Sequence, residues 1–131
     1  MKTRLVLTTA GILLSLLATT AEARERSRSG SATGPQGRSL HRDSSVEAGN
    51  GSYQRHRDVQ GSAGRGYVRD ASGSCAEGSG CSRGVQGTTN SGKTWSRDGS
   101  IVRNDDGSLS GGTVATGPNG ESMSRETTIQ P

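Results

Sequence analysis

The segment Gly87–Thr94 reads Gly-Thr-Thr-Asn-Ser-Gly-Lys-Thr and matches the phosphate-binding loop pattern in full. In such a loop, backbone N–H groups surround the phosphates, Lys93 would contact their charge and the Thr94 hydroxyl would bind Mg²⁺. That chemistry requires a buried strand before the loop and a helix after it. Residues 81–86 do not read as a buried strand, residues 95–99 read as a turn, and no apolar run ends in Asp. We therefore expect no nucleotide at this segment.

The other residues that carry chemistry are too scattered to predict a site. His41 and His56 are the only histidines, and neither belongs to a cluster of carboxylates or thiolates, so we expect solvated side chains and no metal. Asp105 and Asp106 precede Gly107, but the ligand spacing of a calcium loop is not met. A Ser-His-Asp set can be picked from any Ser-rich sequence and carries no information without geometry. We expect no catalytic, cofactor-binding or metal-binding residue, and we predict that the protein is not an enzyme.

The two cysteines, Cys75 and Cys81, are separated by five small or flexible residues. An even cysteine count in an exported chain predicts a disulfide, within one chain or between two. Five intervening residues fit neither the Cys-x-x-Cys redox motif nor a pair of zinc ligands. A loop this short would contribute about 2 kcal/mol, which would fix one hairpin but not a domain.

The first 23 residues have the pattern of a secretory signal peptide. Two basic residues precede an apolar run over residues 5–18, and the small residues Ala21 and Ala23 mark a cleavage site before Arg24. An uncleaved anchor is the alternative. No Cys lies directly after the apolar run, so a lipoprotein is not expected. No later segment is apolar enough to span a bilayer. We predict a periplasmic or secreted protein whose mature chain begins at Arg24.

The rest of the chain repeats itself. The clearest copy of the repeat is Gly92–Asp98, which reads Gly, any, small, bulky, any, Arg, acid. The bulky positions are separated by one step of 13 residues and five steps of 14, which predicts seven degenerate repeats over residues 37–131. The bulky residues are Leu40, Tyr53, Tyr67, Cys81, Trp95, Leu109 and Met123. An Arg follows two residues later in six of the repeats: Arg42, Arg55, Arg69, Arg83, Arg97 and Arg125.

The composition leaves two fold classes open. Only ten residues after position 23 are Leu, Ile or Val, and the chain has no Phe, so a conventional hydrophobic core is not expected. One alternative is a largely disordered chain. The other is an all-β fold of short repeats, a β-hairpin meander or a thin β-solenoid. Turn signals at 34–37, 98–99, 106–107 and 117–120 favour two short strands per repeat. The second strand would hold a loosely recurring apolar position: Val46, Val59, Ile101, Ala115 and Ile129.

Side chains two residues apart share one face of a strand, so each bulky residue would lie beside its own Arg. We expect a Tyr or Trp to contact the Arg of the next repeat, and neighbouring charges such as Arg97 and Asp98 to form ladders. Residues 24–36 begin with an Arg-Ser run and read as a flexible basic linker, with contact to a polyanion as the alternative.

The short motifs Thr-Gly-Pro-Asn-Gly and Ser-Arg, within residues 115–125, give the chain a family resemblance. It resembles short, uncharacterised exported proteins of Gram-negative bacteria, which are rich in Gly, Ser and Thr and carry Thr-Gly-Pro-Asn-Gly repeats after a signal peptide. The Arg-rich repeats and the cysteine pair depart from the Thr-rich pattern of that group. The resemblance implies a periplasmic or secreted location and no particular activity.

The recurring arginines suggest the leading function. The chain has a net charge of +4. Arginine contacts to phosphate and sulfate groups add together as repeats accumulate. We therefore expect a non-enzymatic repeat protein of the cell envelope that makes weak multivalent contacts with a polyanion: an anionic glycan, lipopolysaccharide or extracellular DNA. The alternative is a structural β-repeat protein whose repeats stack on one another and bind neither a small molecule nor a polyanion.

Overall fold

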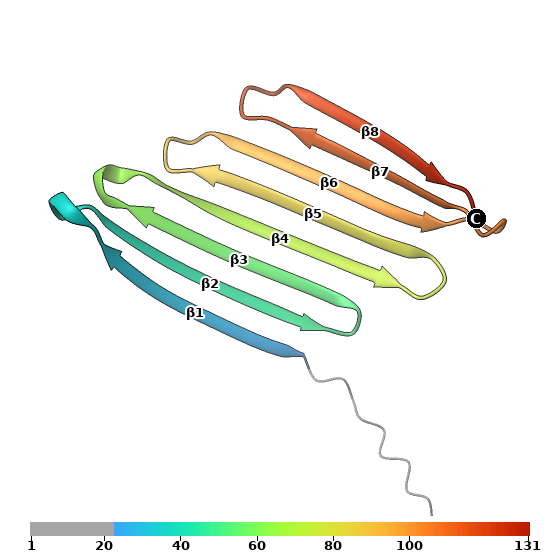
Figure 1. Ribbon diagram of the computed structural model, residues 1–131, viewed down its shortest axis with the longest axis horizontal. Coiled ribbons are helices and arrows are strands. Elements are labelled where there is room, and N and C mark those ends of the chain that lie inside the picture. Colours follow the sequence, from blue (N-terminus) through green and yellow to red (C-terminus); the bar gives the residue numbers. More distant parts are fainter. Residues whose placement is uncertain (1–22) are drawn as a thin grey trace, which may run out of the picture.

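The computed structural model describes residues 23–131, and these residues form one sheet of eight antiparallel strands (Figure 1). The strands are β1 (Arg24–Thr33), β2 (Ser39–Gly49), β3 (Ser52–Gly61), β4 (Gly66–Ala76), β5 (Gly80–Thr89), β6 (Thr94–Arg103), β7 (Leu109–Thr116) and β8 (Ser122–Ile129). Short 3-10 turns, η1 (Pro35–Gly37) and η2 (Ser62–Gly64), follow β1 and β3. Ala21 and nearly all of the expected signal peptide lie outside the described residues, and Ala23 immediately precedes β1.

The strands follow one another across the sheet in sequence order, and each pairs with the next. This is a β-meander, so the all-β prediction and its meander alternative are confirmed. Figure 1 shows a single layer, with no other described element over either face of the sheet. Both faces are therefore open to solvent or to a partner.

Each repeat is one strand followed by one turn. The bulky residue of every repeat is the first or second residue of its strand, from Leu40 in β2 to Met123 in β8. The prediction of two short strands per repeat is wrong, because Asp98 and Gly99 do not form a turn. They lie inside β6, which pairs along its length with β5 and with β7. The hydrogen bonds of two neighbouring strands outweigh a local turn preference.

The turns at 50–51, 106–107 and 117–120 use Asn or Gly at positions with a positive φ. Asn50 and Gly51 connect β2 and β3 with φ values of 50° and 73°, the geometry of a two-residue hairpin turn. The predicted turn at 117–120 is also present, with Gly120 at φ 84° and a hydrogen bond of 2.8 Å from the Gly117 N–H to the Glu121 carbonyl. The turn predicted at 106–107 has the same form, with Gly107 at φ 85°.

Residues 24–33 do not form the flexible linker that the sequence suggested. They form β1, an edge strand paired with β2 from Arg24 opposite Ala48 to Thr33 opposite Ser39. The turn at Pro35–Gly37 brings the chain back so that this pairing is possible. The basic arm is therefore part of the sheet, and its arginines hold fixed positions on it.

The most buried apolar residues lie at the centre of the sheet. Ala71 and Val85 are cross-strand partners and are 7% and 6% exposed. Arg55 and Arg97 flank this pair on β3 and β6, in the same row across the sheet. The aliphatic parts of arginine side chains cover apolar surface while the charged ends stay in water, which accounts for this burial in a single-layer sheet.

Candidate functional site

The register of the sheet decides which side chains share a face. Side chains of directly paired residues lie on the same face, and successive residues of a strand alternate between faces. A repeat of 14 residues, an even number, keeps each repeat position on one face. The single step of 13, from Leu40 to Tyr53, coincides with the one pairing that joins even to odd positions, β2 with β3. All seven bulky residues therefore lie on the same face.

All the arginines in strands lie on that face, which we call the arginine face. The six arginines predicted as polyanion contacts lie on it, although not along one edge as a simple repeat would suggest. Five more join them, and three of these belong to the basic segment 24–36, for which contact with a polyanion was the alternative interpretation. The eleven are Arg24, Arg26, Arg28, Arg42, Arg55, Arg57, Arg69, Arg83, Arg97, Arg103 and Arg125. No Asp or Glu of the eight strands lies on this face.

The opposite face, which we call the acidic face, carries all the carboxylates of the strands. They are Glu25, Asp43, Glu47, Asp58, Asp70, Asp98 and Glu126. Both histidines, His41 and His56, lie on this face as well. The sheet thus has one strongly cationic face and one anionic face.

The local sequence produces this separation. In four repeats the Arg is followed directly by an acid, as at Arg97-Asp98, and consecutive residues of a strand point to opposite faces. The expected ladders between such neighbours are therefore wrong, since the two charges lie on different sides of the sheet. The Arg-acid pairs were visible in the sequence. Because side chains alternate between the two faces of a strand, such pairs predict separated charges and not ladders.

Two aromatic rings on the arginine face, those of Tyr53 and Trp95, lie across glycines. Trp95 is paired with Gly87, and a methyl group added at Gly87 would collide with the indole ring. Across this glycine, the guanidinium carbon of Arg69 lies 5.6 Å from the centre of the Trp95 ring, within cation–π range. The expected contact is present, but with the Arg two repeats away and not the next one. The absence of a side chain at Gly87 lets the ring reach across β5.

The arginines surround two hollows of the arginine face. One, of about 700 Å³, is lined by Arg24, Arg26, Arg28, Arg42 and Arg55, together with Glu25 at the sheet edge and three uncharged residues. The second, of about 390 Å³, lies between Arg69, Arg83, Arg97 and Trp95. Each hollow therefore holds several guanidinium groups that one extended ligand could contact together. A guanidinium group binds two oxygens of a phosphate or sulfate group through two parallel hydrogen bonds.

Arg57 lies between the two groups of arginines and has one unsatisfied polar atom. It is paired directly with Arg69, and like charges in that arrangement repel. Its Nε atom is buried and has no hydrogen-bond partner among the described residues. A bound anion would relieve both conditions.

The histidines on the acidic face have about half-exposed side chains, in line with the expected solvation, and each also contacts an aspartate. His41 Nε2 lies 2.8 Å from an Asp43 oxygen, and His56 Nδ1 lies 2.6 Å from an Asp70 oxygen. A hydrogen bond from Ser29 lowers the pKa of Asp43; partial desolvation opposes this shift and His41 reinforces it. His56 and Asp70 are separated by one repeat, which makes them cross-strand partners at mid-strand.

The segment with the phosphate-loop pattern is a hairpin. Gly87, Thr88 and Thr89 end β5, and Thr94 begins β6, so the loop is followed by a strand. The N–H of Gly92 bonds the Thr89 carbonyl at 2.9 Å, and the Lys93 N–H bonds the Thr89 hydroxyl at 3.1 Å. These two N–H groups therefore donate hydrogen bonds within the turn itself and not to a phosphate group. The segment before the loop does form a strand, but among residues 81–86 only Val85 is buried, so it is not the buried strand that a phosphate-binding loop requires.

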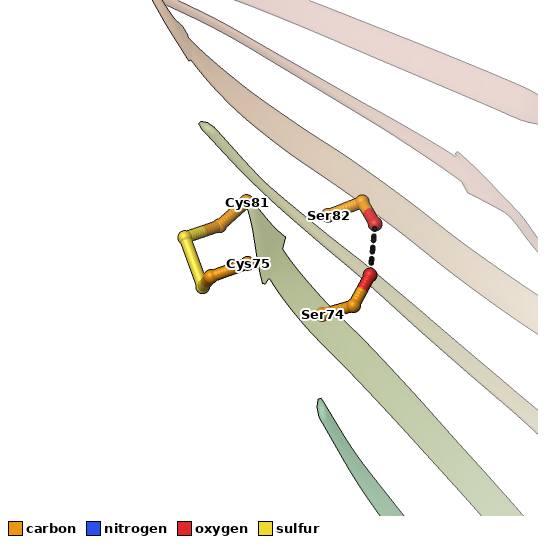
Figure 2. The surroundings of a disulfide bond; sticks show 4 residues. All are labelled: Ser74, Cys75, Cys81 and Ser82. Atoms are coloured by element: carbon orange, nitrogen blue, oxygen red, sulfur yellow. Dashed lines mark hydrogen bonds between the residues drawn. A yellow bond between two sulfur atoms is a disulfide. The ribbon is translucent and has the colours of Figure 1, made fainter. Parts of the chain in front are cut away.

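The predicted disulfide is present and forms within the chain, between Cys75 and Cys81, which are directly paired in the hairpin of β4 and β5. Figure 2 shows it on one side of the hairpin, while the hydroxyls of the adjacent pair, Ser74 and Ser82, meet at 3.4 Å on the other side. The bond fixes the register of the two central strands at one end.

Within residues 23–131 there is no cluster of three metal-ligating side chains and no helix long and apolar enough to cross a membrane. Comparison of the chain with protein families, curated proteins and solved structures finds no match. The candidate site therefore rests on geometry alone: a face of arginines and aromatic residues with no carboxylate among its strand residues.

Proposed function

We propose that the protein is an exported, non-enzymatic component of the cell envelope or its surroundings that binds a polyanion on its arginine face. The ligand is an anionic glycan, lipopolysaccharide or extracellular DNA, and phosphate or sulfate groups provide the shared chemistry. The signal peptide pattern and the resemblance to exported Gram-negative proteins support the location.

One observation carries the proposal: eleven arginines share a face on which no strand carboxylate competes for them. In a folded protein, guanidinium groups are usually paired with carboxylates or left scattered in water. Their concentration on one side attracts a polyanion, and many weak contacts add to a useful affinity. The flat, open shape of the face suits a long ligand better than a small one.

Retention of the full chain, purified from an exporting host, on immobilised heparin tests the proposal. We expect retention at low salt and release as salt rises. Arg55→Gln with Arg97→Gln removes two charges from the arginine face and should cause earlier release. Arg38→Gln with Arg65→Gln removes the same charge from turns and should elute near the wild type. On duplex DNA, the first pair should reduce the slope of log affinity against log salt by about 2.

Two results would contradict the proposal. The first is the absence of retention on heparin, lipopolysaccharide vesicles and DNA at low salt. The second is an equal loss from the face pair and the turn pair, since net charge alone would then explain binding. Comparison of the three matrices distinguishes the ligand classes.

A further inference from the structure

The acidic face has no role in polyanion binding, although it is as extended as the arginine face. It carries seven strand carboxylates and no arginine, so its charge pattern complements the opposite face of the same molecule. It also exposes apolar side chains, with Val102 and Val114 each 47% exposed. The arginine face likewise exposes Leu40 and Ile101 at 47% and Ile129 at 57%.

We propose that copies of this chain stack face to face, with the acidic face of one copy on the arginine face of the next. The occupant of each face is thus a second copy. The inference is independent of the polyanion proposal, although both use the arginine face.

The area of the face is sufficient for a stable contact. Eight strands about 4.8 Å apart, each of about ten residues rising about 3.3 Å, give a face of about 1,200 Å². A stable protein interface buries about 800 Å² on each partner. Aligned stacking of two sheets keeps their strand directions within about 30° and places them about 10 Å apart, close enough for long arginine side chains to meet carboxylates.

Charge excludes the symmetric arrangements. Two arginine faces in contact would set eleven cations against eleven, and two acidic faces would set carboxylates against carboxylates. Contact between unlike faces removes this repulsion and pairs the arginines. Because such a contact leaves one arginine face and one acidic face free at the two ends of the stack, it does not close, and further copies can add.

The stack and the polyanion therefore compete. A ligand on the arginine face blocks the next copy, so a soluble polyanion should shorten stacks, and dilution of the protein should free arginine faces for ligand. The apolar residues of both faces would be covered within the stack, which gives them a reason to be on the surface.

Sedimentation velocity of the full chain, purified from an exporting host, tests the inference over a wide range of protein concentration. We expect an open series of species that grows with concentration at low salt. The series should collapse toward monomer at about 1 M salt, where the screening length is about 3 Å. Added heparin should also shift the series toward smaller species.

A matched pair of variants isolates the acidic face. Glu47→Lys with Glu126→Lys reverses two charges there and should weaken association more than about tenfold, because like charges then meet across the interface. Glu77→Lys with Asp105→Lys makes the same net change in turns and should associate like the wild type. A cooperative urea unfolding transition, followed by the fluorescence of Trp95, checks that the acidic-face variant remains folded.

The outcomes separate the two proposals. A monomer at every concentration in low salt overturns stacking and leaves polyanion binding in place. A closed dimer that does not grow, or equal effects of the two variant pairs, also overturns it. Open association without heparin retention supports stacking and removes the polyanion proposal.

Discussion

At the scale of single residues, glycines decide where the large side chains of the arginine face lie. Gly87 and Gly73 leave room for the rings of Trp95 and Tyr53, each of which lies across the glycine paired with it. Glycine weakens a strand by itself, and an aromatic ring placed over it restores packing. At Gly87 the arrangement also brings Trp95 to Arg69.

Gly87→Ala should therefore destabilise the sheet. The added methyl group displaces the indole ring, and overpacking of this kind costs about 1–3 kcal/mol. Trp95 is the only tryptophan, so its fluorescence reports the change directly, together with the free energy of unfolding in urea. Gly112→Ala is the control, since the nearest atom to its added methyl group would be 3.9 Å away. Equal stability of the two variants would show that the ring does not occupy this position.

A small group of side-chain hydrogen bonds stabilises the turn between β6 and β7. The Asp106 carboxylate accepts hydrogen bonds from the Ser108 hydroxyl at 2.6 Å and the Ser108 N–H at 2.9 Å. Ser108 is 2% exposed, and Asn104 donates to its hydroxyl at 2.8 Å. The two Ser108 bonds, the hydroxyl bond first, lower the pKa of Asp106 from its ordinary value of 3.8.

The lowered pKa of Asp106 determines whether this carboxylate stabilises the fold more at high or at low pH. A carboxyl with a lower pKa in the folded state stabilises the fold above its unfolded pKa, and the contribution is lost as the pH falls through the folded pKa. Asp106→Asn should thus reduce the free energy of unfolding at neutral pH, and the difference from wild type should shrink below pH 3.8. Urea titrations across that range measure it, with Asp105→Asn as the control. A difference that does not vary with pH would rule out this role for the carboxylate.

At the scale of elements, the hairpin of β4 and β5 is the best-secured part of the sheet. It contains the central buried pair, Ala71 and Val85, and the disulfide between Cys75 and Cys81. Its position between three strands on one side and three on the other means that a shift in its register would move every neighbouring strand. One short disulfide thus acts on the whole meander.

Replacement of both cysteines by serine should lower the free energy of unfolding by about 2 kcal/mol, because the reduced chain regains the entropy of a short loop when unfolded. Reduction of the wild type should have the same effect. The control is Ser74→Ala with Ser82→Ala, which alters the adjacent pair on the other side of the hairpin and should change stability little. A double-cysteine variant as stable as wild type would show that the ladder alone holds the register.

At the scale of the whole molecule, opposite charges are separated between the two faces, with eleven strand arginines on one face and seven strand carboxylates on the other. The chain carries 16 Lys and Arg residues and 12 Asp and Glu residues, so its net charge is small. The net charge therefore does not reveal that the strand arginines and the strand carboxylates lie on opposite faces. A sheet with both faces open normally needs a partner for stability. Polyanion binding and stacking are two ways to meet that need, and the variants of the acidic face distinguish them.

Much of the fold was predictable because the repeat is regular. The largely even period, the Arg two residues after six of the seven bulky side chains, the cysteine pair and the turns at 106–107 and 117–120 all follow from local sequence. The role of β1 was not, because the Arg-Ser run of residues 24–31 lacks the apolar alternation of a strand and is ordered by pairing with β2. The contacts of His41 and His56 with aspartates were also missed.

The sequence by itself determined the period of the molecule and the alternation of arginine with acid, since both are properties of neighbouring residues. Only the tertiary structure decided that each repeat is a single strand and that all eleven strand arginines share one face. Register depends on turn lengths and on hydrogen bonds between distant segments, and a slip of one residue would exchange the faces of a whole strand. The β2–β3 turn, which absorbs the single step of 13 residues, keeps the two faces distinct.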